Sequence, residues 1–253
     1  MPNSTTIILP VFNEEGNLRP LVEELSDTFG ETEYSPDYLF VDDASTDDSR
    51  KVLQNLSSKH NPIEVLSLSE HTGKSAALAA GFNQADSSLI ATMDSDGQDR
   101  PADLLAMLGE IDDCDGIAGY RKNRADGWWR KLSSKIANEK RKSFLDDNIR
   151  DSACGLRLFR NKVIEALPRF EGMHRFLPSL ALINGFDIKQ MPVQQRPRKS
   201  GASAYSNIGR LPSTFRDLIG VTWLKQRHID FNVVETINEE TESSDEANSF
   251  TKR

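Results

Sequence analysis

The chain has 253 residues, which is enough for one large domain with a sizeable buried core. Its 31 basic and 39 acidic residues give a formal net charge of −8, which argues against a general nucleic-acid-binding protein. The two cysteines are too few for a disulfide framework and lie in no metal-binding spacing. Because the first residues do not resemble a signal peptide and no apolar run approaches the length of a membrane span, we expect a cytoplasmic protein.

Short apolar runs alternate with helical patterns in the first half of the chain. We predict strands at residues 5–11, 38–41, 63–68, 89–93 and 116–120. Apolar residues at helical spacing predict helices between them, at 14–29, 47–57, 74–84 and 102–111. This alternation is typical of an α/β fold with a central, mostly parallel sheet and helices on both faces. Ligands of such sheets bind beyond the carboxyl ends of the strands.

The second half of the chain is less regular. We predict strands at 153–160 and 186–193, and helices at 127–145, 161–167, 175–184 and 211–227. Residues 196–210 have the Gly, Ser, Pro and basic composition of a mobile loop. Residues 229–253 are predicted to form an acidic, disordered tail.

Charge is unevenly distributed along the chain. Residues 121–142 contain nine basic and two acidic residues, which is a local charge of +7. Residues 230–253 contain seven acidic and two basic residues, which is a local charge of −5. We therefore expect a basic zone on the folded body that can contact phosphates.

Polar residues stand where three of the predicted strands end. They are Asn13-Glu14, Asp42-Asp43 and Asp94-Ser95-Asp96. Carboxylates at the end of a buried strand are costly unless a positive group meets them. Hard divalent cations are usually held by one or two carboxylates together with substrate phosphates. The Asp94-Ser95-Asp96 segment therefore suggests a site for Mg²⁺ or Mn²⁺ that carries a diphosphate.

Three segments in this order resemble the inverting glycosyltransferases of family 2, which have the nucleotide-diphospho-sugar-binding GT-A fold. The segments are Leu9-Pro10-Val11-Phe12-Asn13-Glu14-Glu15, Phe40-Val41-Asp42-Asp43-Ala44-Ser45-Thr46-Asp47 and Asp94-Ser95-Asp96. The resemblance implies one GT-A catalytic domain at residues 1–228. Its nucleotide-sugar-binding half would be 5–120, and its acceptor-binding half, which ends in an amphipathic helix, would be 121–228.

The resemblance also implies roles for the matching residues. The donor site would be formed by Pro10, Phe12, Glu14, Asp42, Asp43, Lys74, Asp94 and Gln98. Within this set, Asp42 would meet the base, and Lys74 would approach phosphate at the start of a helix. Mg²⁺ or Mn²⁺ would be held by Asp94, Asp96 and Gln98.

Several of these residues also have ordinary structural explanations. Asp47 fits a helix cap, Asp43 fits a cap of its own loop, and Lys74 fits an exposed helix residue. A purely structural role is hardest to defend for Asp94 and Asp96 together, because neighbouring carboxylates at the end of a buried strand need a partner. The sequence leaves the first three explanations open.

Segments of the second half resemble the acceptor side of dolichyl- and polyprenyl-phosphate sugar transferases. They are Asp151-Ser152-Ala153-Cys154-Gly155-Leu156-Arg157-Leu158-Phe159-Arg160, Gly172-Met173-His174-Arg175-Phe176-Leu177-Pro178 and residues 192–205. The last resembles their Arg-x-x-Gly-x-Ser-Lys-Tyr loop, but Ala204 stands where Lys is usual. This removes a cation near the phosphates, for which Lys199 and Arg210 are the available substitutes.

The resemblance then implies inverting transfer of a sugar, with mannose as the first expectation, from a GDP- or UDP-sugar to polyprenyl or dolichyl phosphate. A lipid phosphate is already an anionic nucleophile, so it needs positioning and cations more than a general base. The expected contacts to the acceptor phosphate are Arg175, Arg198, Lys199 and Ser203. The expected catalytic residues are Asp96, Asp151 and Arg157. Asp151 would be a base for a hydroxyl acceptor, or would orient a nearby Arg.

A membrane surface is an expected partner of such an enzyme. In the helix at 211–227, apolar residues fall near one face: Leu211, Phe215, Leu218, Ile219 and Thr222, with Trp223 adjacent. That face would pack on the core or lie in the membrane interface. Trp128-Trp129 beside Arg130-Lys131 is a second candidate contact. We expect peripheral association with the cytoplasmic membrane face, and a membrane-protein partner is left open.

Two alternatives compete with transfer to a lipid phosphate. The first is a family 2 transferase that acts on a hydroxyl group of a glycan or another substrate. The second is a non-catalytic nucleotide-sugar-binding protein, for which Ala204 is the sequence hint. A processive synthase is disfavoured, because the chain has no Gln-x-x-Arg-Trp segment.

Overall fold

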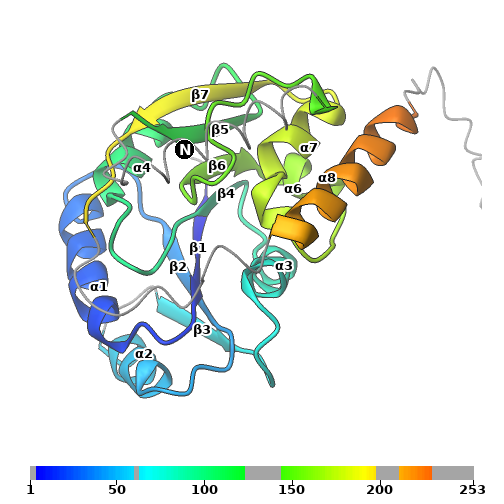
Figure 1. The fold of residues 1–253 in the computed structure, drawn as a ribbon. Helices are drawn as coiled ribbons and strands as arrows, with labels where there is room; N and C mark the ends of the chain where they lie inside the picture. Colours follow the sequence, from blue (N-terminus) through cyan, green and yellow to red (C-terminus); the bar gives the residue numbers. More distant parts are fainter. Residues whose placement is uncertain (1–3, 60–62, 123–143, 198–210, 230–253) are drawn as a thin grey trace, which may run out of the picture.

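A seven-stranded sheet in the order β3-β2-β1-β4-β6-β5-β7 forms the centre of the molecule (Figure 1). The computed structural model describes residues 4–59, 63–122, 144–197 and 211–229. The strands are β1 Thr5–Val11, β2 Asp37–Asp42, β3 Ile63–Ser67, β4 Leu89–Thr92, β5 Gly116–Arg121, β6 Arg157–Arg160 and β7 Ile188–Val193. Of these strands, β6 alone runs antiparallel to its neighbours, β4 and β5. The predicted mostly parallel α/β sheet is confirmed.

Helices cover both faces of the sheet, as predicted. On one face pack α1 Glu15–Phe29, α2 Ser49–Ser57 and α4 Pro101–Leu108. On the other pack α3 Lys74–Gln84, α6 Asn161–Ala166, α7 Leu177–Ile183 and α8 Leu211–Gln226, with the short 3-10 helix η1 Met173–Arg175. The alternation along β1 separates the two cores, because Ile7 and Leu9 belong to the first and Ile8 to the second.

Element boundaries follow the predictions closely in the first half of the chain and less closely in the second. The strand at 5–11 and the helix at 74–84 begin and end at the predicted residues. The strand predicted at 153–160 begins only at Arg157, because the Asp151 side chain and carbonyl accept the backbone N–H groups of Ala153 and Cys154 and form a turn. The helix predicted at 175–184 is divided, since Pro178 stands in the first turn of a new helix, α7.

Some predictions fall wholly or mostly outside the described residues. They are the helix at 127–145 apart from its last two residues, most of the loop at 196–210, and nearly all of the tail at 229–253. Trp128, Trp129, Arg130 and Lys131 lie there as well. In the part of the chain that is described, no helix combines the length and apolar character needed to cross a membrane.

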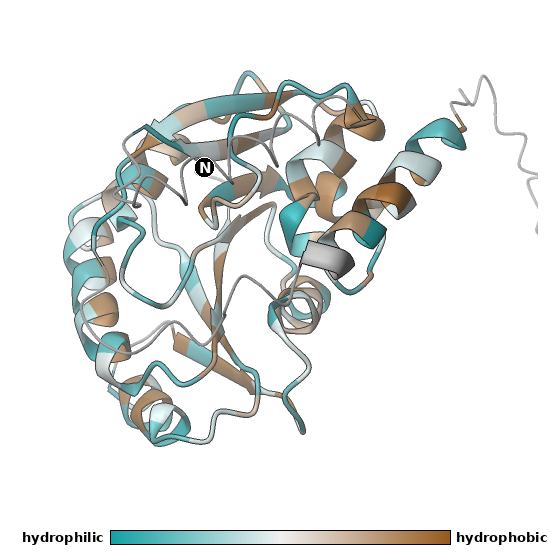
Figure 2. Cartoon of the chain, viewed as in Figure 1, coloured by the Kyte–Doolittle hydropathy of each residue, from teal (hydrophilic) through white to brown (hydrophobic). Residues whose placement is uncertain are grey.

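The helix α8 corrects one prediction about its apolar side chains. Leu218 and Val221 are buried in the second core, whereas Phe215, Ile219 and Trp223 are exposed. The predicted face, which spans about 100° of the helix, is divided in the structure: its Leu218 edge packs on the core, and its Ile219 edge is exposed. The helix therefore has a buried apolar face and a separate exposed one, and Figure 2 shows apolar residues along α8 at the edge of the fold.

Candidate active site

The carboxyl ends of three neighbouring parallel strands, β2, β1 and β4, meet at one edge of the sheet. A cleft with about 570 Å³ of empty space opens there. It is lined by Pro10, Val11, Phe12, Glu14, Asp43, Lys74, Ala77, Asp94, Ser95 and Asp96. Of the residues predicted for the donor and the metal, all but Asp42 and Gln98 belong to this lining. The structure thus brings the sequence segments together where the fold places ligands.

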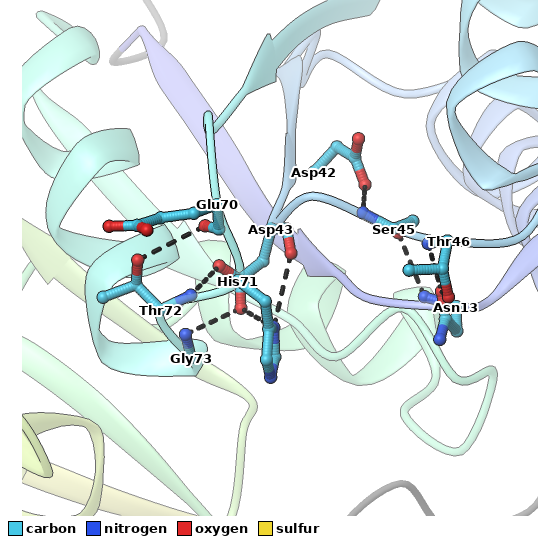
Figure 3. A network of polar contacts seen from close by, with 9 residues as sticks. All are labelled: Asn13, Asp42, Asp43, Ser45, Thr46, Glu70, His71, Thr72 and Gly73. Atoms are coloured by element: carbon cyan, nitrogen blue, oxygen red, sulfur yellow. Dashed lines mark hydrogen bonds and ion pairs between the residues drawn. The ribbon is translucent and has the colours of Figure 1, made fainter.

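The loops that follow β1 and β2 are joined by Asn13. Its side-chain oxygen accepts the backbone N–H of Thr46 at 2.8 Å, and its backbone N–H donates to the Ser45 hydroxyl at 3.0 Å (Figure 3). The same side-chain oxygen accepts the backbone N–H of Asp47 at 3.3 Å. Asn13 has φ = 57°, a left-handed conformation that Asn tolerates better than most residues. This conformation turns the chain between Phe12 and Glu14, both of which line the cleft.

The side chains of Asp42 and Asp47 accept hydrogen bonds from backbone N–H groups in this region. Asp42 is buried, and its side chain accepts the N–H of Ser45 at 3.1 Å. Asp47 accepts the N–H of Ser49 at 2.9 Å and that of Glu15 at 3.2 Å, at the starts of α2 and α1. Asp47 thus binds the first backbone N–H of both helices, although it is Asp48 that occupies the N-cap position of α2. The contact of Asp42 with a nucleotide base stays a prediction.

Asp43 connects the end of β2 to the loop that precedes α3 (Figure 3). Its carboxylate is buried and accepts the N–H of Thr72 at 2.9 Å and that of Gly73 at 2.8 Å. The same carboxylate lies 2.8 Å from Nδ1 of His71, whose ring stacks on Phe12 at 3.8 Å between centroids. Asp43 thus caps a distant loop in addition to lining the cleft.

We expect Asp43→Ala to lower the free energy of unfolding by about 1–3 kcal/mol, because it leaves two backbone N–H groups without their acceptor. Nucleotide binding should weaken as well, since the loop that leads to Lys74, the first residue of α3, loses its anchor. Urea unfolding and nucleotide titration measure the two effects. Asp37→Ala, at the exposed opposite end of β2, is the matched control and should change neither. Equal stability of Asp43→Ala and wild type would contradict this account.

The turn after β4 gathers three carboxylates. Asp94 forms an ion pair with Lys74, and its backbone N–H donates to Asp99 at 3.2 Å. Burial would raise the pKa of Asp94, but the charge and hydrogen bond of Lys74, helped by Arg157, hold it below its ordinary value. Burial, followed by the charge of Asp94, raises the pKa of Asp99 to about 7. The sequence assigned no role to Asp99, because its burial cannot be deduced from a turn.

The raised pKa of Asp99 has a consequence for stability. The folded protein holds this proton more tightly than the unfolded chain, so its stability should fall as the pH rises from about 4 to about 7. Asp99→Asn removes the charge and should flatten this part of the profile, with a gain at pH 8 of at most about 4 kcal/mol. Urea unfolding at several pH values measures the change. Asp103→Asn, in the first turn of α4, is the control, because an Asn oxygen can still accept the N–H of Gln194. An unchanged profile for Asp99→Asn would contradict the assignment.

The residues of this turn fit a divalent cation. Asp94 and Asp96 offer oxygen ligands only, the type that Mg²⁺ and Mn²⁺ prefer. After burial, the charges of Asp94 and Asp96 contribute to the raised pKa of Asp99, so the region around the pair carries a negative potential. Among the described residues, no group of three or more His, Cys, Asp or Glu side chains forms a complete metal site. A pair of carboxylates suits a cation whose remaining ligands are phosphates and water.

Gln98 lies outside the cleft lining and contacts the segment that follows β7. Its side-chain amide donates to the carbonyl of Arg196 at 3.2 Å, and its own carbonyl accepts the N–H of Arg196 at 3.0 Å. Arg196 also donates to the carbonyl of Asp99 at 2.9 Å and to Glu24 at 2.9 Å. Gln98 therefore fixes the turn after β4 against the second half of the chain, and its role as a metal ligand stays a prediction.

Asp151 is held by an arginine that the sequence did not single out. Arg121, at the end of β5, donates to both oxygens of Asp151, at 2.6 and 2.8 Å. This bidentate pair fits the orienting role that the sequence offered as the alternative to a general base. Arg157 is buried nearby and donates to the carbonyl of Ser152 at 2.9 Å. Burial lowers the pKa of Arg157, while Cys154, Asp94, Asp151 and Asp99 oppose this shift.

Arg175 borders a second cavity, with about 1010 Å³ of empty space, and donates to Asp217 at 3.2 Å. The cavity is lined by His71, Thr72, Gly73, Lys74, Ser75, Glu171, Gly172, His174, Arg175, Arg216 and Asp217. Lys74 lines both this cavity and the cleft. The other predicted acceptor contacts, Arg198, Lys199 and Ser203, lie outside the described residues, as do Ala204 and Arg210.

Residues 6–167 match the family model described as glycosyl transferase family 2. The chain is 31% identical over 219 residues to the undecaprenyl-phosphate 4-deoxy-4-formamido-L-arabinose transferase of Proteus mirabilis, an alignment that covers 86% of this chain and 67% of the relative. It is 31% identical over 222 residues to the dodecaprenyl-phosphate galacturonate synthase of Rhizobium johnstonii, with 85% and 65% covered. The chain thus spans about two thirds of the length of these relatives.

The fold also resembles solved structures. Glucosyl-3-phosphoglycerate synthase from Mycobacterium tuberculosis, in complex with Mn²⁺, UDP and phosphoglyceric acid, superposes with a TM-score of 0.66 and 15% identity. The superposition covers 90% of this chain and 80% of that one. The predicted GT-A fold is confirmed by this likeness. Taken with the family match across the strand-end cleft, it shows that the chain belongs to glycosyltransferase family 2.

Proposed function

We propose that the protein transfers a sugar from a nucleoside-diphosphate donor to a polyprenyl phosphate, with inversion at the sugar carbon and with Mg²⁺ or Mn²⁺. The observation that carries this proposal is the cleft in which Phe12, Lys74 and the pair Asp94 and Asp96 meet at the strand ends. The names of both relatives support the acceptor class, since each describes a polyprenyl-phosphate sugar transferase or synthase.

Different residues of the cleft would contact the nucleoside and the diphosphate of the donor. Phe12, whose outer support is the stacked ring of His71, would border the nucleoside, and Glu14 lines the same cleft as Phe12. A cation held by Asp94 and Asp96 would supply charge neutralisation on the diphosphate. Lys74 would place a second positive charge at the same group. In the reaction, the bond from the sugar to the diphosphate breaks and a bond to an acceptor phosphate oxygen forms on the opposite face.

The acceptor phosphate makes a general base unnecessary. Its oxygen is already anionic, so the protein needs to position it and balance its charge. The pairing of Asp151 with Arg121 agrees with such a reaction, because a carboxylate committed to an arginine is a poor proton acceptor. A hydroxyl acceptor would require that base, and this contact therefore disfavours it.

Several sugars and two nucleotide bases are candidates for the donor. The names of the relatives give formamido-arabinose and galacturonate, so mannose is one candidate among several. Both UDP- and GDP-sugars belong in the test. A lipid acceptor also places the reaction at a membrane surface, and we propose peripheral association with the cytoplasmic face.

Transfer assays with a panel of labelled UDP- and GDP-sugars test this function. We expect one donor to give a product with polyprenyl phosphate in detergent or vesicles, in a reaction that requires Mg²⁺ or Mn²⁺. Glycan acceptors with free hydroxyl groups are the control and should give no product. Product on the glycans alone would replace the lipid acceptor with a hydroxyl acceptor, and donor binding without turnover on either would indicate a non-catalytic binding protein.

A further inference from the structure

The ring of Phe12 is covered on one side by a residue from a distant part of the chain. His71 lies in the loop between β3 and α3, and its ring stacks on Phe12 with 3.8 Å between centroids and 22° between ring planes. Of the two rings, Phe12 lines the cleft, whereas His71 lines the second cavity. His71 can therefore act on a ligand in the cleft through Phe12.

Burial of apolar area does not account for this pair of rings. The side chain of His71 is 44% exposed, and Phe12 is only half-buried. Two rings that remain open to solvent bury little area against each other, so their stacking contributes little to folding. A side chain in such a position ordinarily samples several rotamers, because no packing selects one of them. A further interaction is needed to hold His71 against Phe12.

Asp43 provides that interaction. Its buried carboxylate lies 2.8 Å from Nδ1 of His71, and its backbone carbonyl lies 3.3 Å from the same nitrogen. An ionised carboxylate accepts hydrogen bonds and donates none, so Nδ1 carries the proton in this contact. The carboxylate also accepts the N–H groups of Thr72 and Gly73 (Figure 3). One buried group thus fixes both the ring of His71 and the backbone that follows it.

The three side chains form a series of contacts that ends in the cleft. Asp43 is held in the interior, His71 is held by Asp43, and Phe12 is covered by His71. A ring that is held before the ligand arrives does not have to be ordered by the ligand, and this raises affinity. The groups proposed for the diphosphate lie elsewhere, on the turn after β4 and at the start of α3.

We propose that His71 is a positioning residue for the donor: it is held by Asp43 and fixes the ring of Phe12 in the orientation on which the nucleoside base stacks. This inference rests on the proposed function and adds to it a residue that the sequence did not single out. Removal of the His71 ring should cost affinity and leave the chemical step intact, because the carboxylates proposed for the cation are unchanged. KM for the donor should then rise while kcat stays the same.

Three substitutions separate the ring of His71 from its hydrogen bond. His71→Asn keeps a nitrogen that can donate to Asp43 but lacks the ring, His71→Phe keeps a ring without the donor, and His71→Ala lacks both. Titration calorimetry with UDP and with GDP, in the presence of Mn²⁺, measures nucleotide affinity. For the nucleotide that binds wild type, Asn and Ala should weaken binding about tenfold and Phe about threefold, because the aromatic contact is lost or loosened.

Two controls separate positioning from an effect on the fold. Glu70→Ala changes the neighbouring exposed side chain and keeps the carbonyl that accepts the Thr72 hydroxyl, so its nucleotide affinity should equal that of wild type. Urea unfolding of His71→Asn should also match wild type, because Asp43 keeps its donors on Thr72 and Gly73. A clear loss of stability in His71→Asn would assign His71 to the fold and overturn the positioning role.

A double-mutant cycle tests whether His71 acts through Phe12. Phe12→Leu should weaken nucleotide binding at least as much as His71→Asn does. The double variant should bind no more weakly than Phe12→Leu alone, because the ring that His71 positions is already absent. Additive losses would place His71 in direct contact with the nucleotide and would overturn the proposal.

Steady-state kinetics distinguishes failure of this inference from failure of the proposed function. His71→Asn should raise KM for the donor about tenfold at unchanged kcat, and a fall in kcat at unchanged KM would overturn the positioning role. If wild type transfers sugar but binds nucleotide no better than His71→Asn, the positioning role fails and the proposed function stands. If nucleotide binding depends on His71 and Phe12 but no acceptor receives a sugar, the proposed function fails and the positioning role stands.

Discussion

Asp96→Ala is expected to lower kcat/KM for transfer by about a thousandfold or more, because it removes half of the carboxylate pair proposed to hold the cation. Metal-dependent nucleotide binding should disappear with it. Titration calorimetry of UDP and GDP, each with and without Mn²⁺, measures this loss on wild type and variant. One nucleotide should bind to wild type in a metal-dependent way, and this also identifies the donor base.

Asp96→Asn separates charge from the shape of the turn. The Asp96 side chain accepts the N–H of Gln98 at 3.0 Å, and an Asn oxygen can accept the same bond. Asn should therefore preserve the stability of the turn while abolishing metal-dependent binding. Full metal-dependent activity in either variant would show that the carboxylates at the end of β4 do not form the donor site.

Arg157→Leu is expected to lower the free energy of unfolding by at least about 3 kcal/mol, because it removes a buried cation from a group of acidic side chains. Asp94 and Asp151 would then lose one of the positive charges that balance them in a low-dielectric region. The pKa of Asp94 would rise, since Arg157 contributes to its depression. Urea unfolding at neutral pH measures the change in stability.

The controls for this variant are a conservative change and a distant one. Arg157→Lys keeps the charge and should recover part of the stability, but not the hydrogen bond to Ser152 in its full geometry. Arg19→Leu, on the exposed side of α1, should have little effect. If Arg157→Leu were as stable as wild type, the carboxylates around it would have to be neutral in the folded protein.

The location of the cleft was predictable because it follows from local patterns and one rule of topology. Apolar runs such as 5–11 and 89–93 mark buried strands, and the polar residues directly after them must lie at the strand ends. Parallel strands place those ends at one edge of the sheet, and the adjacent positions of β2, β1 and β4 then bring Phe12, Asp43 and Asp94 into one cleft.

Contacts between distant segments were not predictable in the same way. Asp43 accepts hydrogen bonds from Thr72 and Gly73, and Arg121 binds Asp151, but no periodicity connects either pair. The antiparallel direction of β6 could not be predicted either, because a short apolar run in a sequence does not indicate which way its strand runs in the sheet. The burial that raises the pKa of Asp99 depends on packing from several elements at once.

Lys74 belongs to the walls of both the donor cleft and the second cavity, and its ammonium group is paired with Asp94. A single positive charge shared by two sites makes their occupancies interdependent, since an anion on one side alters the potential felt on the other. Such coupling is reciprocal, so an anion bound in the cleft changes the affinity of the second cavity for another anion by the same factor as the reverse. One side chain is therefore enough to couple the occupancy of the cleft to that of the second cavity.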